Sequence, residues 1–171
     1  AIMGGGITGA LVAYHLSKAG IPCILLDKRK IGMGSTCAST ALLQYEIDTP
    51  LMELIEYVGY EQAVLSYQLC IEAIAKIEKI TQTLTADVGF KRRPSFYYKY
   101  KKKDVDELRR EYQLRRDIGI ELEFWTKEQI EKTFSFSAPA ALFSAEGAQI
   151  DAYRFTHELL QEAQKNKTLV F

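Results

Sequence analysis

The sequence has no excess of either charge. Its 171 residues include 22 Lys plus Arg and 22 Asp plus Glu, so the formal net charge is zero. Nucleic acids and anionic membrane surfaces attract basic proteins through long-range electrostatics, and a neutral chain lacks that attraction. We therefore expect no nucleic-acid partner.

Long apolar runs and an N-terminal targeting segment are also missing. No apolar run reaches the ~18 residues of a membrane-spanning helix, and the N-terminus has no basic region followed by a cleavage site. Cysteines are few, because Cys23, Cys37 and Cys70 are the only ones and lie far apart. Such spacing predicts neither a disulfide framework nor a metal site. The sequence thus predicts a cytoplasmic protein with no integral membrane segment.

What the sequence does contain is a glycine-rich turn near its start. Residues 1–9 read AIMGGGITG, in which Gly4, Gly6 and Gly9 have the GxGxxG spacing. In a nucleotide-binding turn the first glycine permits the tight turn, and the second lets a diphosphate approach the backbone. The third lets the following helix pack closely on the strand. The turn therefore predicts a nucleotide site, provided that a helix follows it.

A helix is indeed predicted after the turn, and it ends at Gly20. The N-terminus of this helix, with its partial positive charge and free N–H groups, would face the turn, which suits a diphosphate. The apolar residues expected to form its buried stripe are Leu11, Val12, Tyr14, His15, Leu16 and Ala19.

The apolar run IPCILL, residues 21–26, follows the helix and ends in Asp27. This run predicts a strand that is buried on both faces, as in a parallel sheet. A carboxylate about 20 residues beyond a nucleotide-binding turn accepts hydrogen bonds from a ribose diol. The order of strand, turn, helix, strand and acid predicts a dinucleotide site.

This motif alone does not separate NAD from FAD, since both contain an adenosine ribose and a diphosphate. Lys28 and Arg29 leave NADP open as well, because two cations could face a 2′-phosphate. The next segment, KIGMGSTCASTALLQYEIDTPL, supplies four hydroxyl side chains at the expected start of another helix, where an anion is favoured. These belong to Ser35, Thr36, Ser39 and Thr40. The alternative is a helix cap that is rich in hydroxyl groups.

The stretches GGGITGA and LLDKRKIGMGSTCASTALLQYEID resemble the N-terminus of FAD-dependent oxidoreductases related to D-amino-acid oxidase, glycine oxidase and sarcosine oxidase. Flavin-dependent glycerol-3-phosphate dehydrogenases share a similar serine-rich segment. The resemblance implies an α/β fold, in which a Rossmann-like FAD-binding domain is interrupted by an α+β substrate domain with a mainly antiparallel sheet. The FAD domain would comprise residues 1–47 and 143–171, and the helices and substrate portion residues 48–142. The chain would be the N-terminal half of a larger protein.

The same resemblance implies which residues would hold FAD. Those around the adenosine and the diphosphate would be Gly4, Gly6, Ile7, Thr8, Gly9, Asp27, Lys28, Arg29, Ser35, Thr36, Ser39 and Thr40. Leu42, Leu43 and Gln44 would approach the isoalloxazine ring. Some members tether the flavin through a histidine in this loop, where Ala38 stands here, so the resemblance implies non-covalent FAD. Asp27 stands where flavoproteins more commonly have glutamate, which shortens the reach to the ribose.

The middle of the chain predicts helices and strands. Residues 49–84 are expected to be helical with a break near Gly59, and Asp104 is expected to cap a charged helix. The segment RRPSFYYKYKKKD is basic and rich in tyrosine, but its alternation predicts a half-exposed antiparallel strand and not a nucleic-acid site. Thr126 and Gln129 predict a capping box, and Asp151 predicts the cap of a last helix. The face expected to be buried in residues 49–84 comprises Leu69, Ala73, Ile74, Ile77, Ile80 and Leu84.

The resemblance implies an enzyme in which the flavin accepts a hydride while the protein supplies position and electrostatics. The predicted function is an FAD-dependent oxidase or dehydrogenase of an amine, amino acid or small hydroxy compound. The small-molecule substrate would be an amine or an amino acid. No catalytic residue can be assigned: His15 and His157 are expected to be structural, while Tyr45, Tyr97, Tyr98 and Arg93 are possible pocket members. The alternatives are an NAD(P)-binding Rossmann domain and a fragment without activity of its own.

Overall fold

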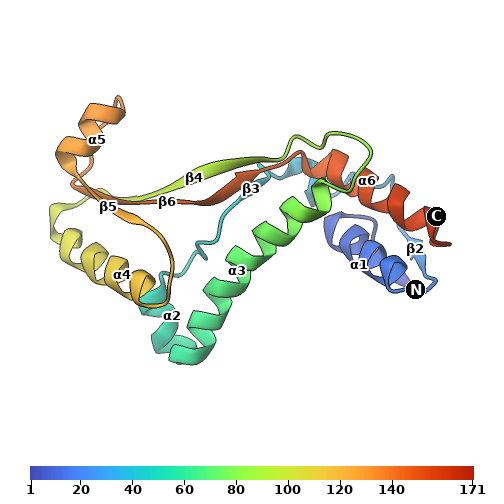
Figure 1. The fold of residues 1–171 in the computed structure, drawn as a ribbon, viewed down its shortest axis with the longest axis horizontal. Helices are drawn as coiled ribbons and strands as arrows, with labels where there is room; N and C mark the ends of the chain where they lie inside the picture. Colours follow the sequence, from blue (N-terminus) through green and yellow to red (C-terminus); the bar gives the residue numbers. More distant parts are fainter. The chain divides into compact units, whose positions relative to one another are not determined.

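The computed structural model describes residues 1–171, apart from the side chain of residue 102. The chain forms two compact units, which we describe separately (Figure 1). Unit 1 comprises Ala1–Leu42, Ile77–Lys91 and Gln149–Phe171, and unit 2 comprises Leu43–Lys76 and Arg92–Ala148. The domain boundaries expected from the sequence stay a prediction.

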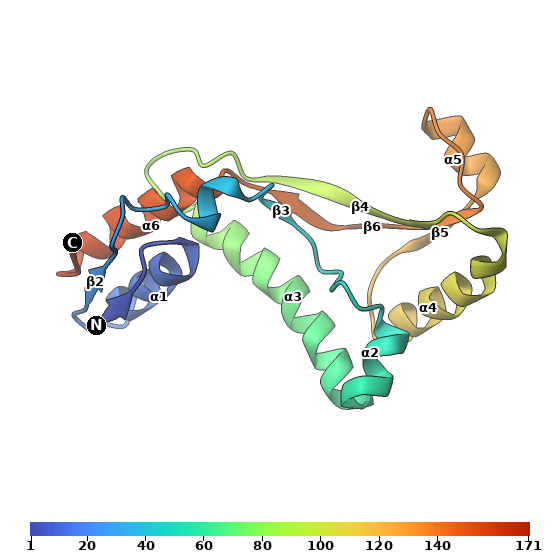
Figure 2. The ribbon, with the colours of Figure 1, turned by 180° about the vertical axis from the view of Figure 1, so that it is seen from behind.

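Unit 1 is built on a small parallel sheet. Its strands are β1 (Ile2–Met3), β2 (Ile24–Leu26) and β7 (Leu169–Val170), in the order β1-β2-β7. Two helices, α1 (Ile7–Lys18) and α6 (Ala152–Lys165), lie side by side in both ribbon views (Figures 1 and 2). The strand–helix–strand order confirms the α/β arrangement expected for the N-terminus.

Helix α1 buries a different face from the one expected. Ala10, Ala13, Tyr14 and Ser17 are buried, whereas most of the expected stripe is exposed or half-buried. Small side chains at three- and four-residue spacing let two helix backbones approach closely, which is how α1 packs on α6. The expected stripe was wrong because close packing favours small residues over large apolar ones. The predicted end of the helix is confirmed, since Gly20 has a φ of +74°.

Strand β2 is shorter and less buried than expected. Leu25 is fully buried, but Ile24 and Leu26 are 42% and 37% exposed. Successive side chains of a strand point to opposite faces, so one face of β2 is covered and the other is open among the residues described. The expectation of a strand buried on both faces was therefore wrong for this part of the chain.

Unit 2 combines four helices with most of a second sheet. The helices are α2 (Leu51–Val58), the first part of α3 (Tyr60–Thr81), α4 (Val105–Asp117) and α5 (Lys127–Thr133). The sheet has the order β3-β6-β4, and β5 also pairs with β6; its strands are β3 (Leu42–Leu43), β4 (Lys91–Lys99), β5 (Glu123–Thr126) and β6 (Ala140–Gln149). Strand β5 is antiparallel to β6, with Glu123 opposite Phe143. Figures 1 and 2 both show β4 and β6 running side by side.

The predicted helix break is confirmed at Gly59, which separates α2 from α3 and has a φ of +84°. The expected buried face of α3 was partly wrong. Ile74 and Ile80 are buried, but Leu69 is 50% exposed. The N-terminal part of the helix instead buries Ala63 and Tyr67. The aromatic ring contributes more buried area than a leucine, and its hydroxyl finds a backbone acceptor there.

Side-chain alternation along β4 is as predicted. Phe96 and Tyr98 contact Phe136 on one side of the strand, with ring centroids 6.0 and 5.3 Å away. Tyr97 faces the other way, and its ring centroid is 5.4 Å from the guanidinium carbon of Arg115. The tyrosines of this segment are therefore used for packing on both faces of a strand.

Two of the three predicted helix caps are confirmed. The Thr126 N–H donates to Gln129 Oε1 (2.8 Å), and the Arg154 N–H donates to Asp151 Oδ1 (2.9 Å). Asp104 stands at the expected N-cap of α4 but makes no capping hydrogen bond. Its backbone is helical because it ends the 3₁₀ turn η2 (Lys102–Asp104), whereas a capping side chain needs an extended backbone.

None of the helices in the described part of the chain combines the length and apolar character that a bilayer crossing requires.

Gly147 offers a test of the strand packing in unit 2. A Cβ at this position would lie 2.6 Å from the Arg93 carbonyl oxygen of β4, and a backbone atom cannot move away without shifting the strand. We expect Gly147→Ala to lower the free energy of unfolding by about 1–3 kcal/mol. Urea denaturation measures this change. Ala145→Ser, at an exposed position of the same strand, is the control and should stay within about 0.5 kcal/mol; equal stability of the two variants would contradict the packing.

Candidate functional site

The glycine-rich turn joins β1 to α1 within unit 1. Gly4 has a φ of +107°, a conformation that side chains rarely allow, and its N–H donates to the Leu26 carbonyl (2.7 Å). A Cβ on Gly9 would lie 1.9 Å from the Gly4 carbonyl oxygen. Only glycine therefore lets α1 begin so close to the strand. This is the close packing that the last glycine of a nucleotide-binding turn provides.

Asp27 lies beside this turn at the end of β2. Its Oδ2 accepts a hydrogen bond from the Gly5 N–H (2.6 Å), and its Oδ1 accepts one from the Arg29 N–H (2.7 Å). These two hydrogen bonds hold the pKa of Asp27 below its usual 3.8, and the bond from Gly5 has the larger effect. The side chain is partly exposed, and each carboxylate oxygen has a second lone pair. An ionised Asp27 can therefore accept further hydrogen bonds from a diol.

The hydroxyl-rich loop does not begin an α-helix but forms a single 3₁₀ turn, η1 (Ser35–Ala38). Thr36 is buried, and its Oγ1 accepts a hydrogen bond from the Ile7 N–H (3.0 Å) at the start of α1. A Cβ on Gly6 would lie 3.0 Å from the same hydroxyl oxygen. Thr36 therefore ties the loop to the glycine turn, and it acts as a cap for α1 and not for a helix of its own.

The other hydroxyls of this loop are exposed. Thr36, Ser39 and Thr40 share the wall of a hollow of about 370 Å³, whose far side is formed by Asp151 and Tyr153 at the start of α6. The structure thus brings these three hydroxyls together, and Thr36 connects the hollow to the turn. Among the residues described, neither the glycines of the GxGxxG motif nor Asp27 line this hollow.

The basic residues after Asp27 lie in two settings. Lys28 is exposed, and the Arg29 guanidinium lies against Gly34, where a Cβ would be 2.9 Å from Nη2. Arg29 therefore covers the loop that leads to η1.

Ile7 and Thr8 form the first turn of α1, as a diphosphate site at this helix would require.

The residues expected near the isoalloxazine ring lie on and just after β3. Leu42 is 58% exposed and Gln44 is also exposed, whereas Leu43 is half-buried. Because side chains alternate along an extended segment, Leu42 and Gln44 share one face and are open to a ligand. The roles of all these residues remain predictions.

The two histidines differ in their surroundings. His15 is exposed on α1. The His157 ring packs on Tyr153, with centroids 4.5 Å apart, and its Nε2 is buried without a hydrogen-bond partner among the described residues. A Cβ on Gly32 would lie 3.8 Å from His157 Nε2. The structural role expected for both histidines stays a prediction.

Sequence reasoning missed a buried ionic cluster in unit 2, centred on Arg115 of α4. Arg115 is 1% exposed, and its Nη2 and Nε each lie 2.7 Å from Glu111 Oε1. Burial acts to lower the pKa of Arg115, but the Glu111 carboxylate together with the neighbouring Tyr45 and Tyr67 raises the pKa overall. Leu108, Glu111 and Arg115 recur at helical spacing on one face. That spacing was visible in the sequence, which predicted a charged helix here but no burial of its charged residues.

The cluster holds several elements of unit 2 together. Glu111 accepts hydrogen bonds from the Leu51 and Met52 N–H groups (2.7 and 2.9 Å), and so caps the start of α2. Arg115 Nη1 donates to the Tyr45 hydroxyl (3.3 Å) and lies 3.7 Å from Glu46 Oε1. Tyr45, one of the possible pocket members, is thus fully buried in this cluster.

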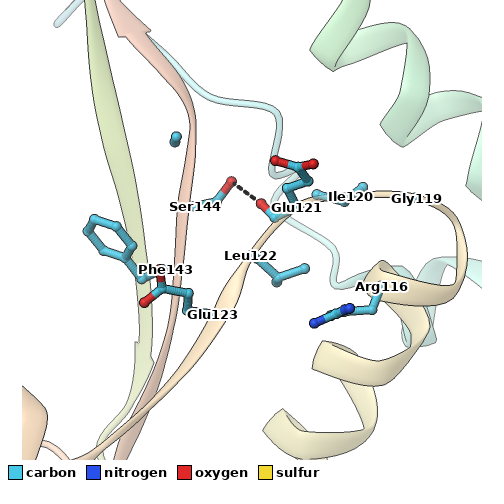
Figure 3. A pocket seen from close by; sticks show the side chains of 9 residues that line it. Arg116, Gly119, Ile120, Glu121, Leu122, Glu123, Phe143 and Ser144 are labelled. Carbon is cyan, nitrogen blue, oxygen red and sulfur yellow. Dashed lines mark hydrogen bonds between the residues drawn. The ribbon is translucent and has the colours of Figure 1, made fainter.

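A surface groove of about 510 Å³ lies elsewhere in unit 2, where α4, the start of β5 and β6 meet (Figure 3). The Ser144 hydroxyl points at the Glu121 backbone carbonyl, to which it donates (3.1 Å), and it accepts from the Glu146 N–H (3.2 Å). Arg116 donates to the Tyr112 hydroxyl (3.3 Å) and Glu123 accepts from Trp125 (2.8 Å). Since these charged groups are already partnered, the groove supports no assignment as a substrate site.

Known proteins provide an independent comparison. A family model described as FAD dependent oxidoreductase, of the D-amino-acid oxidase (DAO) type, matches residues 1–171. The chain belongs to the FAD-dependent oxidoreductases of this family. The resemblance noted in the sequence is confirmed, and the family's cofactor is FAD. The chain is 28% identical over 171 residues to human mitochondrial dimethylglycine dehydrogenase, covering 96% of this chain and 18% of that protein.

Solved structures show that the family's fold is present. Glycine oxidase from Geobacillus kaustophilus matches with a TM-score of 0.71 at 20% identity, covering 99% of this chain and 45% of that one. L-α-Glycerophosphate oxidase from Mycoplasma pneumoniae, a structure with FAD bound, matches with a TM-score of 0.74 at 19% identity, covering 99% and 43%. This FAD-dependent oxidoreductase chain therefore spans less than half the length of each relative named here.

The surroundings of Asp27 predict its titration. Because two backbone N–H groups stabilise the carboxylate, the folded pKa lies below 3.8. The stabilisation is then complete above pH 3.8 and is lost as the pH falls through the lowered folded value. NMR titration of the side-chain carboxyl carbon, identified by its absence in Asp27→Asn, should give a midpoint below 3.8. A midpoint at or above 3.8 would contradict the two hydrogen bonds.

Proposed function

We propose that the protein is an FAD-dependent oxidase or dehydrogenase that oxidises an amine or amino acid and binds its FAD non-covalently. The observation that carries the proposal is the glycine turn of unit 1, in which the Gly9–Gly4 approach brings α1 against the strand beside the Asp27 carboxylate. Family membership supports FAD over the nicotinamide dinucleotides.

The residues expected to bind FAD would divide the cofactor between them. Asp27 would accept hydrogen bonds from the ribose diol, and Gly6 with the first turn of α1 would face the diphosphate. The hydroxyls of Ser35, Ser39 and Thr40 are exposed in the loop that Thr36 ties to the start of α1, and they would donate to phosphate oxygens. Leu42, which is exposed at the end of the first segment of unit 1, would present its side chain to the ring. FAD, when bound, supplies the hydride-accepting chemistry, while these residues supply orientation and exclude water.

This loop has no histidine that could tether the flavin covalently. None lies between Asp27 and Gln44, and η1 ends at Ala38. Amines and amino acids are the proposed substrate class because two relatives are named for such reactions, dimethylglycine dehydrogenase and glycine oxidase. A small hydroxy compound is the second class to be tried, since the fold is shared with a glycerophosphate oxidase.

The first experiment is a visible absorption spectrum of the full-length protein before and after acid precipitation. We expect a flavin spectrum that moves into the supernatant, because the cofactor is bound without a covalent bond. Turnover should then be screened with glycine, N-methylated glycines, other amino acids and glycerol phosphate. A protein that stays colourless after FAD is added, and binds NAD or NADP, would contradict the proposal.

Asp27 and Asp87 make a matched pair of variants. Each accepts a hydrogen bond from the N–H two residues further on, from Arg29 (2.7 Å) and Gly89 (2.8 Å). A hydrogen bond to a charged group contributes about 1.5–3 kcal/mol, so Asp27→Asn should raise the Kd for FAD roughly 10- to 100-fold. Asp87→Asn should leave it unchanged. Fluorescence titration of the apoprotein with FAD measures both, and equal effects of the two variants would contradict the ribose contact.

A further inference from the structure

We propose that Tyr153 and His157 of α6 are positioning residues, which hold Gly32 against the glycine turn and keep that turn in the form that binds the FAD diphosphate. All of these residues belong to unit 1. The inference rests on the proposed function, because it takes the glycine turn as the place of the diphosphate. It gives His157 a role in cofactor binding, where the sequence predicts a structural role.

The peptide of Gly5, inside the glycine turn, is held at both of its polar groups. Its N–H donates to Asp27 Oδ2 (2.6 Å), and its carbonyl accepts a hydrogen bond from the Gly32 N–H (3.0 Å). The Ile31 side chain occupies the space beside Gly5 where a Cβ would lie. The conformation of the turn therefore depends on where residues 31–32 are placed.

Gly32 also connects the turn to the hydroxyl-rich loop. Its carbonyl accepts a hydrogen bond from the Cys37 N–H (3.1 Å) of η1. Thr36, in the same 3₁₀ turn, accepts a hydrogen bond from the Ile7 N–H (3.0 Å) at the start of α1. A displacement of Gly32 would thus reach the turn by two routes, through the Gly5 carbonyl and through the first N–H of α1.

Two aromatic side chains of α6 lie against Gly32. A Cβ on Gly32 would lie 2.9 Å from Cδ2 of Tyr153 and 3.8 Å from Nε2 of His157. The two residues are four apart on one helix face, and their ring centroids are 4.5 Å apart. The start of α6 and η1 also lie side by side in both ribbon views (Figures 1 and 2). Gly32 is therefore packed against α6 while it is hydrogen-bonded to the turn.

The His157 ring is used here for its shape. Its Nε2 is buried and finds no hydrogen-bond partner in the part of the chain that the structure describes. A buried nitrogen without a partner costs stability, whereas the ring itself packs on Tyr153 beside Gly32. The proposal therefore needs an aromatic ring at position 157 but no nitrogen, which separates positioning from ligand binding or proton transfer.

Preorganisation of the turn gives the ring pair its effect on FAD. A site that is in its binding-competent form for a fraction of the time binds more weakly in proportion to that fraction. Without the rings, the Gly32 backbone loses its packing on α6, and its hydrogen bond to the Gly5 carbonyl opens more often. A turn that is competent about a tenth of the time gives a Kd that is about tenfold higher.

The first test measures FAD binding by fluorescence titration of the full-length apoprotein. Tyr153→Ala and His157→Ala should each raise the Kd for FAD about tenfold. His157→Phe keeps the ring without Nε2 and should stay within about twofold of the wild type. Leu159→Val is the control, because Leu159 is fully buried and lies two residues further along α6, on its opposite face. It should lower the urea midpoint but leave the Kd within about twofold.

Amide hydrogen exchange, followed by NMR in the apoprotein, measures the positioning itself and needs no cofactor. The Gly32 N–H should exchange about tenfold faster in Tyr153→Ala and His157→Ala, because its hydrogen bond to the Gly5 carbonyl opens more often. The N–H groups of Gly5 and Ile7 should follow in the same direction. All three should keep their wild-type rates in His157→Phe.

Unchanged exchange and an unchanged Kd in both alanine variants would overturn the positioning role. An equal loss of affinity in His157→Phe and His157→Ala would also overturn it, since the nitrogen and not the ring would then be needed. A tenfold weaker Kd in Leu159→Val would do the same, because lost stability alone would explain the effect. A wild-type protein that binds no FAD would contradict the proposed function, whereas normal wild-type binding with unaltered alanine variants would contradict the positioning role alone.

Discussion

The close approach between Gly9 and the Gly4 carbonyl oxygen is the constraint on which unit 1 depends. A side chain at Gly9 would overlap that oxygen, so α1 can begin beside β1 only because glycine is there. Once the helix starts at this point, its small residues Ala10 and Ala13 meet α6. Asp27 then lies close enough to accept the Gly5 N–H. A single missing Cβ thus places the turn, the helix and the acid.

Unit 2 depends on a different constraint, the need to match a buried cation. Arg115 is nearly inaccessible, and Glu111 neutralises it while also capping α2. Removing one partner of such a buried pair typically costs about 3–5 kcal/mol, because the remaining charge is left uncompensated. The cluster therefore ties α4, α2 and the chain after β3 into one arrangement.

The constraint in unit 1 is the one that bears on function. The family depends on FAD, and its chemistry belongs to the cofactor, which leaves orientation and electrostatics to the protein. In the proposed function, the glycine turn and Asp27 hold the adenosine diphosphate portion. The chain spans less than half of its relatives, so the identity of the substrate lies with the protein as a whole.

The sequence by itself determined the order of elements in unit 1, the break at Gly59, the strand alternation of β4 and the caps at Thr126 and Asp151, because each depends on local geometry within a few residues. Tertiary structure decided which face of α1 is buried, and it joined Thr36 to the start of that helix. It also decided that Glu111 and Arg115 lie in the core. A charged pair at helical spacing has the same pattern whether it is solvated or buried, and only the packing of distant segments around it decides between the two.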